Sequence, residues 1–194
     1  MNIAIFLSGR GSNFLSISDS IKSGKLNAKI VLVGSNNADA VGLQKAQESG
    51  YNTQVFNRQE FGDGKKFAKF MDDEFSKFGV EYIVLAGYLR KMPPRIIETY
   101  KDRIINIHPA LLPKFGGKGM YGLHVHNSVL EAGESETGVT IHFVDNKYDN
   151  GNIIAQKSIP VLTDDTPETL SARVLELEHS FYPEVLQKIA TNSL

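Results

Sequence analysis

Cysteine is absent from the 194 residues of this chain. The absence excludes disulfide bonds, thiolate metal ligands and thiol nucleophiles. The chain also lacks a run of about eighteen or more apolar residues, the length a membrane-spanning helix needs, and it opens directly on a strand-like run rather than a signal sequence. We therefore expect a soluble cytoplasmic protein without a membrane partner.

An excess of charge of either sign is missing as well. The 21 basic residues nearly balance the 22 acidic residues, and no block of like charge stands out. The composition therefore gives no electrostatic footprint for nucleic acid or for an anionic membrane. Any bound anion must be held by a few local groups rather than by the overall charge of the protein.

Short apolar and β-branched runs recur along the first half of the chain. Between them lie segments with helical spacing, which predicts repeated βα units around a mostly parallel sheet. The length favours a single domain over residues 1–194. The predicted strands are Ile3–Leu7, Ile30–Gly34, Thr53–Phe56, Tyr82–Ala86 and Arg103–Ile107.

The second half of the chain ends in a predicted hairpin and helix. Residues 138–144 alternate, Asn150-Gly151 is a turn signal, and residues 152–161 are extended again. Residues 165–168 start a helix, in which Pro183 is expected to cause a kink or a division. The predicted fold class is thus a single-domain, doubly wound α/β fold with a C-terminal β-hairpin and helix.

A glycine- and proline-rich stretch follows the strand that ends at Ile107. Residues 109–122 include Pro109, Pro113 and four glycines, with little periodicity. We expect a long loop here, and such loops in compact domains are usually functional.

Residues 8–13, Ser-Gly-Arg-Gly-Ser-Asn, lie where the first strand leads into the first helix. Backbone N–H groups and the helix dipole can bind an anion at such a place, although an ordinary tight turn is the alternative. Phe14 replaces the third glycine of a dinucleotide fingerprint, and the second strand ends at residues 34–36 without an acid. A single phosphate fits this loop better than a dinucleotide does.

Asn106 and His108 stand two residues apart at the end of a predicted strand, so their side chains point to the same side. An amide can stabilise an oxyanion and an imidazole can relay a proton, but a structural histidine is the alternative. A carboxylate partner would come from Asp145 or Asp149, in a turn that is equally consistent with a solvated hairpin.

The other histidines of this half of the chain give weaker evidence for a functional site. His124 and His126 lack other ligands at metal-binding spacing, so helix entry or loop packing is the favoured interpretation. His142 lies in an alternating strand and is a candidate to line the site.

Several motifs occur in an ordered, collinear series along nearly the whole chain. Together they resemble the phosphoribosylglycinamide formyltransferase family. The motifs are residues 8–13, 85–90, 106–113 and 138–144, Asp149, Glu178-His179 and Tyr182-Pro183.

This resemblance implies transfer of a formyl group from 10-formyltetrahydrofolate, the co-substrate, to glycinamide ribonucleotide in purine biosynthesis. It implies no metal, and it leaves monomer and homodimer open. The implied catalytic residues are Asn106, His108 and Asp149, with Asp149 keeping His108 protonated. The implied substrate residues are Gly11, Ser12 and Asn13 for the phosphate and Glu178 for the ribose. The implied folate pocket consists of Leu89, Arg90, Lys91, Met92, Asn106, Asp145, Asn146, Lys147, Tyr148 and Asp149.

The chain departs from the family pattern at three places. Gly64 stands where a folate-contacting arginine is common in the family, and Lys65 or Lys66 is a candidate replacement. Leu175 stands at a position that is usually polar. Residues 118–122 look like an insertion. Two rival functions are formyltetrahydrofolate hydrolase and a non-catalytic nucleotide-binding module. Methionyl-tRNA formyltransferase is disfavoured, because the chain is not basic.

Overall fold

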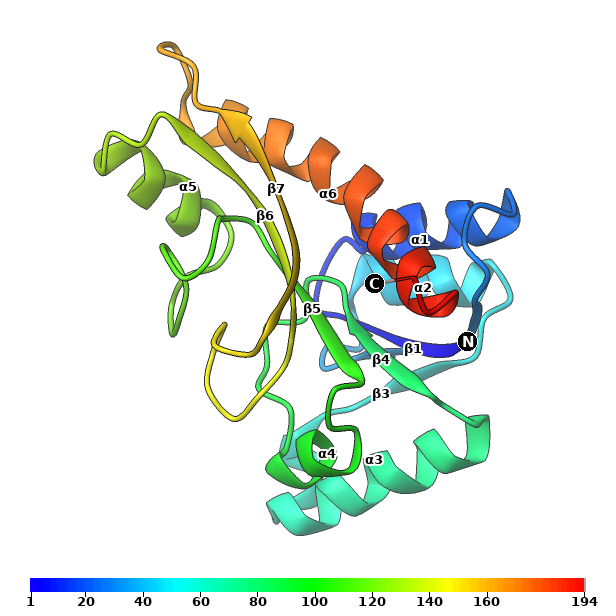
Figure 1. Ribbon diagram of the computed structural model, residues 1–194. Helices are drawn as coiled ribbons and strands as arrows, with labels where there is room; N and C mark the ends of the chain where they lie inside the picture. The colour runs from blue at the N-terminus through cyan, green and yellow to red at the C-terminus, as the bar shows by residue number, and fades with distance from the viewer. Residues whose placement is uncertain (194) are drawn as a thin grey trace.

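The computed structural model describes residues 1–193, within which one sheet is covered by helices on both faces (Figure 1). The strands are β1 (Asn2–Leu7), β2 (Lys29–Ser35), β3 (Thr53–Val55), β4 (Tyr82–Leu85), β5 (Ile104–His108), β6 (Glu136–Phe143) and β7 (Ile153–Pro160). The helices are α1 (Ser12–Lys22), α2 (Val41–Glu48), the short 3-10 helix η1 (Arg58–Phe61), α3 (Gly64–Phe78), α4 (Pro94–Thr99), α5 (Leu123–Glu131) and α6 (Pro167–Ala190).

The strand order is β3-β2-β1-β4-β5-β6-β7. Strands β1 to β5 pair in parallel, whereas β6 and β7 are antiparallel additions. The strand order reverses on either side of β1, which creates a crevice beyond the carboxyl ends of β1 and β4. The predicted α/β fold, with its mostly parallel sheet, C-terminal hairpin and final helix, is confirmed.

Each face of the sheet has its own apolar core. Helices α1, α2 and α6 cover one face and α3 and α4 the other (Figure 1). Helix α3 buries Phe67 and Phe75 against the sheet, and its apolar side chains recur with the 3.6-residue period of a helix that covers a core. The central strands are apolar on both sides because both faces are covered.

No bounds are predicted for helix α5 from the sequence, although helix entry is one interpretation of His124 and His126. The helix has only nine residues and begins directly after Gly122, so its apolar period is short. Its buried face consists of Val125, His126 and Val129, and a histidine in that stripe conceals the pattern.

Of the two effects expected at Pro183, a kink or a division, the division of the last helix is wrong. Helix α6 begins after its N-cap Thr166 and continues through Pro183 to Ala190. Proline cannot donate to the carbonyl of His179 four residues earlier. The Ser16 hydroxyl donates to that carbonyl instead, so the lost bond is replaced from α1.

Tyr182 of α6 joins β4 and the neighbouring strand β5. Its ring is fully buried, and its hydroxyl lies 3.2 Å from the carbonyl oxygen of Leu85 and 3.0 Å from that of Ile105. The hydroxyl can donate to either carbonyl, so α6 contacts the last residue of β4 and the second residue of β5.

We expect Tyr182→Phe to lower the free energy of unfolding by about 1–3 kcal/mol, because the buried carbonyls lose their donor while the ring is kept. Urea denaturation measures this change. Tyr100→Phe is the matched control, because the Tyr100 hydroxyl makes a longer bond of 3.4 Å to Val80 and is expected to have the smaller effect. Equal losses in the two variants would contradict the assigned role.

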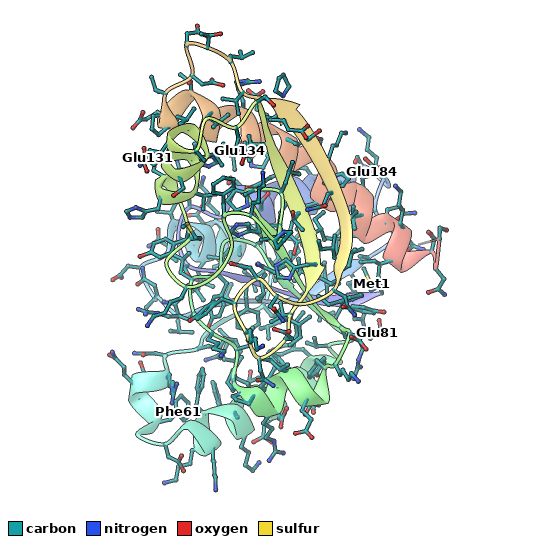
Figure 2. The ribbon with its side chains drawn as sticks, turned by 60° about the vertical axis from the view of Figure 1, so that its left-hand side comes forward. Met1, Phe61, Glu81, Glu131, Glu134 and Glu184 are labelled. Atoms are coloured by element: carbon teal, nitrogen blue, oxygen red, sulfur yellow. The ribbon has the colours of Figure 1, made fainter. Side chains whose placement is uncertain are left out.

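The amino ends of β1 and β4 lie on the side of the sheet away from the crevice. Met1 and Glu81 lie close together in Figure 2, at the amino ends of β1 and β4. The crevice lies at the opposite, carboxyl ends of these parallel strands.

No helix within residues 1–193 is long and apolar enough to cross a membrane.

Candidate active site

An open cleft of about 1080 Å³ lies beyond the carboxyl ends of β1, β4 and β5. Of the site residues named from the sequence, all line this cleft except Asn146. Asn146 contributes its backbone carbonyl, which accepts a hydrogen bond from the Lys91 ammonium group. The lining residues in common with the sequence prediction are Gly11, Ser12, Asn13, Leu89, Arg90, Lys91, Met92, Asn106, His108, Asp145, Lys147, Tyr148, Asp149 and Glu178.

The loop between β1 and α1 leaves the start of the helix uncapped. Gly11 is the N-cap residue with φ of 72°, and among the described residues no side chain caps the helix. The first N–H groups of α1 therefore face the cleft without a side-chain acceptor, as an anion site requires. Gly42 of α2 supports the loop by donating its N–H to the Gly9 carbonyl at 2.9 Å.

We expect Gly11→Ala to distort this loop and to raise the KM of a phosphorylated substrate, with a loss of thermal stability. A Cβ on Gly11 would lie 2.7 Å from the Gly42 Cα, and the positive φ adds strain. Gly9→Ala is the matched control, because a Cβ there meets nothing within 4 Å. Thermal unfolding and substrate titration of both variants test this; similar behaviour in both would show that close approach at Gly11 is unimportant.

Ser8 connects the two halves of the cleft, a role that the sequence did not reveal. Its hydroxyl donates to Asn36 Oδ1 at 2.5 Å and accepts from the Leu89 N–H at 2.8 Å. The anion loop is thereby tied to the loop after β4. Only tertiary structure brings these three residues together.

Glu178 is a buried carboxyl group beside the anion loop. Its side chain accepts from Asn13 Nδ2 at 2.6 Å, and the residue is only 8% exposed. Burial raises the pKa of Glu178 to about 7, and the hydrogen bond from Asn13 opposes this shift only in part. The folded protein therefore carries an ionisation penalty near neutral pH.

The pKa of Glu178 gives a pH-dependent prediction. Because the folded-state pKa lies above the ordinary 4.5, stability is retained at low pH and falls as the pH rises through about 7. We expect Glu178→Gln to be more stable than the natural chain by up to about 3 kcal/mol near pH 8, with most of this difference lost near pH 5. Urea denaturation at both pH values tests this, and a pH-independent difference would contradict the raised pKa.

Asn106 and His108 project from β5 into the centre of the cleft. His108 is 3% exposed, and its Nε2 lies 2.8 Å from the Phe115 carbonyl oxygen. A carbonyl only accepts, so Nε2 carries the hydrogen and Nδ1 of the neutral ring is the free acceptor. His108 Nδ1 faces Asp149 Oδ2 at 3.7 Å.

Of the two turn aspartates, Asp149 is the one beside the histidines. Its side chain is only 12% exposed, its φ is 51°, and its carboxylate accepts from the Gly117 N–H at 2.9 Å. Asp145 instead stabilises the turn, accepting from the Lys147 N–H and from Asn150 Nδ2. The alternative of a wholly solvated turn is therefore wrong for Asp149.

The electrostatics correct one expectation drawn from the family resemblance. Burial lowers the pKa of His108 below its ordinary value of 6.5, and the negative charge of Asp149 opposes this shift without overcoming it. Burial alone would raise the pKa of Asp149, but the nearby His142 and His108 rings and the Gly117 N–H lower it overall. Asp149 is therefore an anion, while His108 of the free protein favours the neutral form near pH 7.

His126 also lines the cleft and was interpreted from the sequence as a packing residue. It is 3% exposed on the buried face of α5, and its Nδ1 has no hydrogen-bond partner among the described residues. Burial, and then the nearby His108, lower its pKa to about 4. His124 by contrast is exposed at the start of α5 beside the Tyr121 ring, which fits the helix-entry interpretation. Within residues 1–193, no set of three or more His, Asp or Glu side chains is placed to hold a metal ion.

The three departures noted in the sequence all lie near the cleft. Leu175 and residues 118–122 line it. Gly64 and Lys65 line an adjacent hollow of about 1120 Å³, which Lys91 and Met92 share with the main cleft. The guanidinium group of Arg58 would lie 3.2 Å from a Cβ on Gly64, so an arginine occupies this region from a different position. Lys66 is absent from the lining.

The geometry defines an α/β protein with a ligand cleft at the switch point of a doubly wound sheet, containing an anion loop and an amide, imidazole and carboxylate cluster. Within that class, the chain belongs to the formyl transferase family, whose model, described as "Formyl transferase", matches residues 1–186.

Relatives share similarity along nearly the whole chain. The phosphoribosylglycinamide formyltransferase of Escherichia coli K12 is 36% identical over 194 residues, covering 100% of this chain and 89% of the relative. The chloroplastic phosphoribosylglycinamide formyltransferase of Arabidopsis thaliana is 44% identical over 189 residues and 96% of this chain. The chain spans only 64% of the length of that plant relative. The crystal structure of phosphoribosylglycinamide formyltransferase from Brucella melitensis superposes with a TM-score of 0.89 at 42% identity, covering 97% of this chain and 95% of that structure.

Proposed function

We propose that this chain transfers the formyl group of 10-formyltetrahydrofolate to the glycinamide amine of glycinamide ribonucleotide, a step of de novo purine biosynthesis. The observation that carries the proposal is one cleft lined by the anion loop, by residues 89–92 and by Asn106, His108 and Asp149. The similarity to two phosphoribosylglycinamide formyltransferases, of which this chain covers 89% and 95%, supports the proposal.

The two substrates would divide the cleft between them. The phosphate of glycinamide ribonucleotide would bind the N–H groups of Gly11, Ser12 and Asn13, and the ribose would lie near Glu178. The co-substrate would bind between residues 89–92 and the 145–149 turn. In this arrangement Asn106 and His108 would lie between the two substrates, where the amine and the formyl carbon must meet.

The chemistry follows from the donors at that meeting point. The amine attacks the formyl carbon, a C–N bond forms, and the carbonyl oxygen becomes an oxyanion. An N–H of Asn106 and a protonated His108 would stabilise this oxyanion. The attacking nitrogen then loses a proton, the folate nitrogen gains one, and the bond between that nitrogen and the formyl carbon breaks. Asp149, an anion next to His108, favours imidazolium as charge develops.

An assay of 10-formyltetrahydrofolate consumption, with and without glycinamide ribonucleotide, tests the proposal. We expect consumption only when both are present, with formation of the formylated ribonucleotide. Consumption that is independent of the acceptor would indicate a hydrolase. Binding of the ribonucleotide without any consumption would indicate a non-catalytic nucleotide-binding module.

The cytoplasmic location and the oligomeric state, monomer or homodimer, stay predictions from the sequence. A plant relative is named as chloroplastic, so family membership alone does not fix the compartment.

A further inference from the structure

His142 on β6 stands directly opposite Asn106 on β5. The two residues are Cα partners in the antiparallel pairing, and His142 Nε2 lies 3.1 Å from Asn106 Nδ2. His142 is 2% exposed. The pairing of β6 with β7 shifts its register between Ile141 and His142, an irregularity of the kind that re-aims a side chain beside a site.

The hydrogen-bond partners of the His142 ring fix its tautomer. Nδ1 lies 2.7 Å from the backbone carbonyl oxygen of Phe143, which can only accept, so Nδ1 carries the hydrogen. The neutral ring then has its lone pair on Nε2, which accepts from Asn106. The chain packs tightly around this carbonyl, because a Cβ on Gly151 would clash with the Phe143 oxygen.

This tautomer determines which end of the Asn106 amide faces the ring. Two acceptors cannot share a hydrogen bond, so the amide oxygen is excluded from the position next to Nε2. The amide nitrogen takes that position and uses one of its two hydrogens there. Its second hydrogen is left for another acceptor. Asp149 Oδ1, 3.7 Å from Nε2, lies beyond hydrogen-bonding distance and does not replace Asn106 at the ring.

We propose that His142 is a positioning residue that orients the Asn106 amide so that its second N–H is presented to the reacting carbonyl oxygen. This inference rests on the proposed formyl transfer for its consequence, but not for its geometry. Without the ring acceptor, the amide is free to turn its oxygen toward the oxyanion, where it would repel the developing charge.

Kinetics of two His142 variants and a double-mutant cycle test the functional half of the inference. We expect His142→Leu to lower kcat about tenfold to a hundredfold with little change in either KM, and His142→Gln, whose side-chain oxygen can accept, to recover part of the loss. In an Asn106→Ala background, His142→Leu should have almost no further effect, because its action passes through Asn106. Additive losses, or normal turnover in His142→Leu, would overturn the proposal.

A nuclear magnetic resonance experiment on the natural chain tests the geometric half without any substrate. Two-bond nitrogen–proton correlations of the His142 ring, recorded where the ring is neutral, should show a protonated Nδ1 and an unprotonated Nε2. The Asn106 side-chain amide resonances should shift in His142→Leu. A ring protonated at Nε2 would overturn the inference. If the natural chain shows the expected tautomer but no formyl transfer, the proposed function fails, and so does the catalytic consequence assigned to His142.

Discussion

Replacement of Asn106 or His108 by alanine is expected to lower turnover by about a hundredfold or more, while the protein still folds. Asn106→Ala removes an oxyanion donor, and His108→Ala removes the imidazole of β5 whose positive charge, when it is protonated, would stabilise the oxyanion. Steady-state kcat with both substrates saturating measures the loss. Because His108 is buried and bonded to Phe115, circular dichroism and thermal unfolding must accompany the assay.

His124→Ala is the matched control for this prediction. His124 is an exposed histidine of α5 that packs on Tyr121 and is not among the residues lining the cleft. We expect its turnover to stay within about twofold of the natural chain, as for most surface substitutions. Near-normal turnover in both Asn106→Ala and His108→Ala would refute the catalytic assignment.

The sequence predicted the parts of the site that depend on local pattern. Asn106 and His108 end an apolar run, and strand alternation alone places them on one side. The anion loop follows from glycines between a strand and a helix. Both predictions concern residues that are close in sequence, and the structure places all of them at the same cleft.

The missed features depend on contacts between distant segments. Asp149 is partly buried because its carboxylate bonds the Gly117 N–H from the preceding long loop. Ser8 reaches Asn36 and Leu89 only after three strands have assembled. The lowered pKa of His108 likewise arises first from burial, which no local motif encodes. A family pattern can suggest which charged groups lie together. The net pKa shift, which combines the effects of burial and charge, follows only from the folded structure.

The balance between burial and charge at His108 gives the remaining prediction, for Asp149→Asn. Asparagine tolerates the positive φ of this position, and its side-chain oxygen can still accept from the Gly117 N–H, so the shape is kept while the negative charge is lost. Asp149 is the group whose charge raises the pKa of His108 against burial.

Without that charge the pKa of His108 should fall further below its ordinary value, and the protonated fraction near pH 7 should fall about tenfold for each unit. We therefore expect turnover to drop by one to two orders of magnitude at neutral pH and to recover in part on acidification, since the oxyanion then regains a nearby positive charge. A titration of the His108 ring by nuclear magnetic resonance measures the midpoint directly. Asp145→Asn, in the same turn but bonded to Lys147 and Asn150, is the control and should leave the midpoint nearly unchanged. If Asp149→Asn also leaves it unchanged, Asp149 is not the electrostatic partner of His108, whatever its effect on the rate.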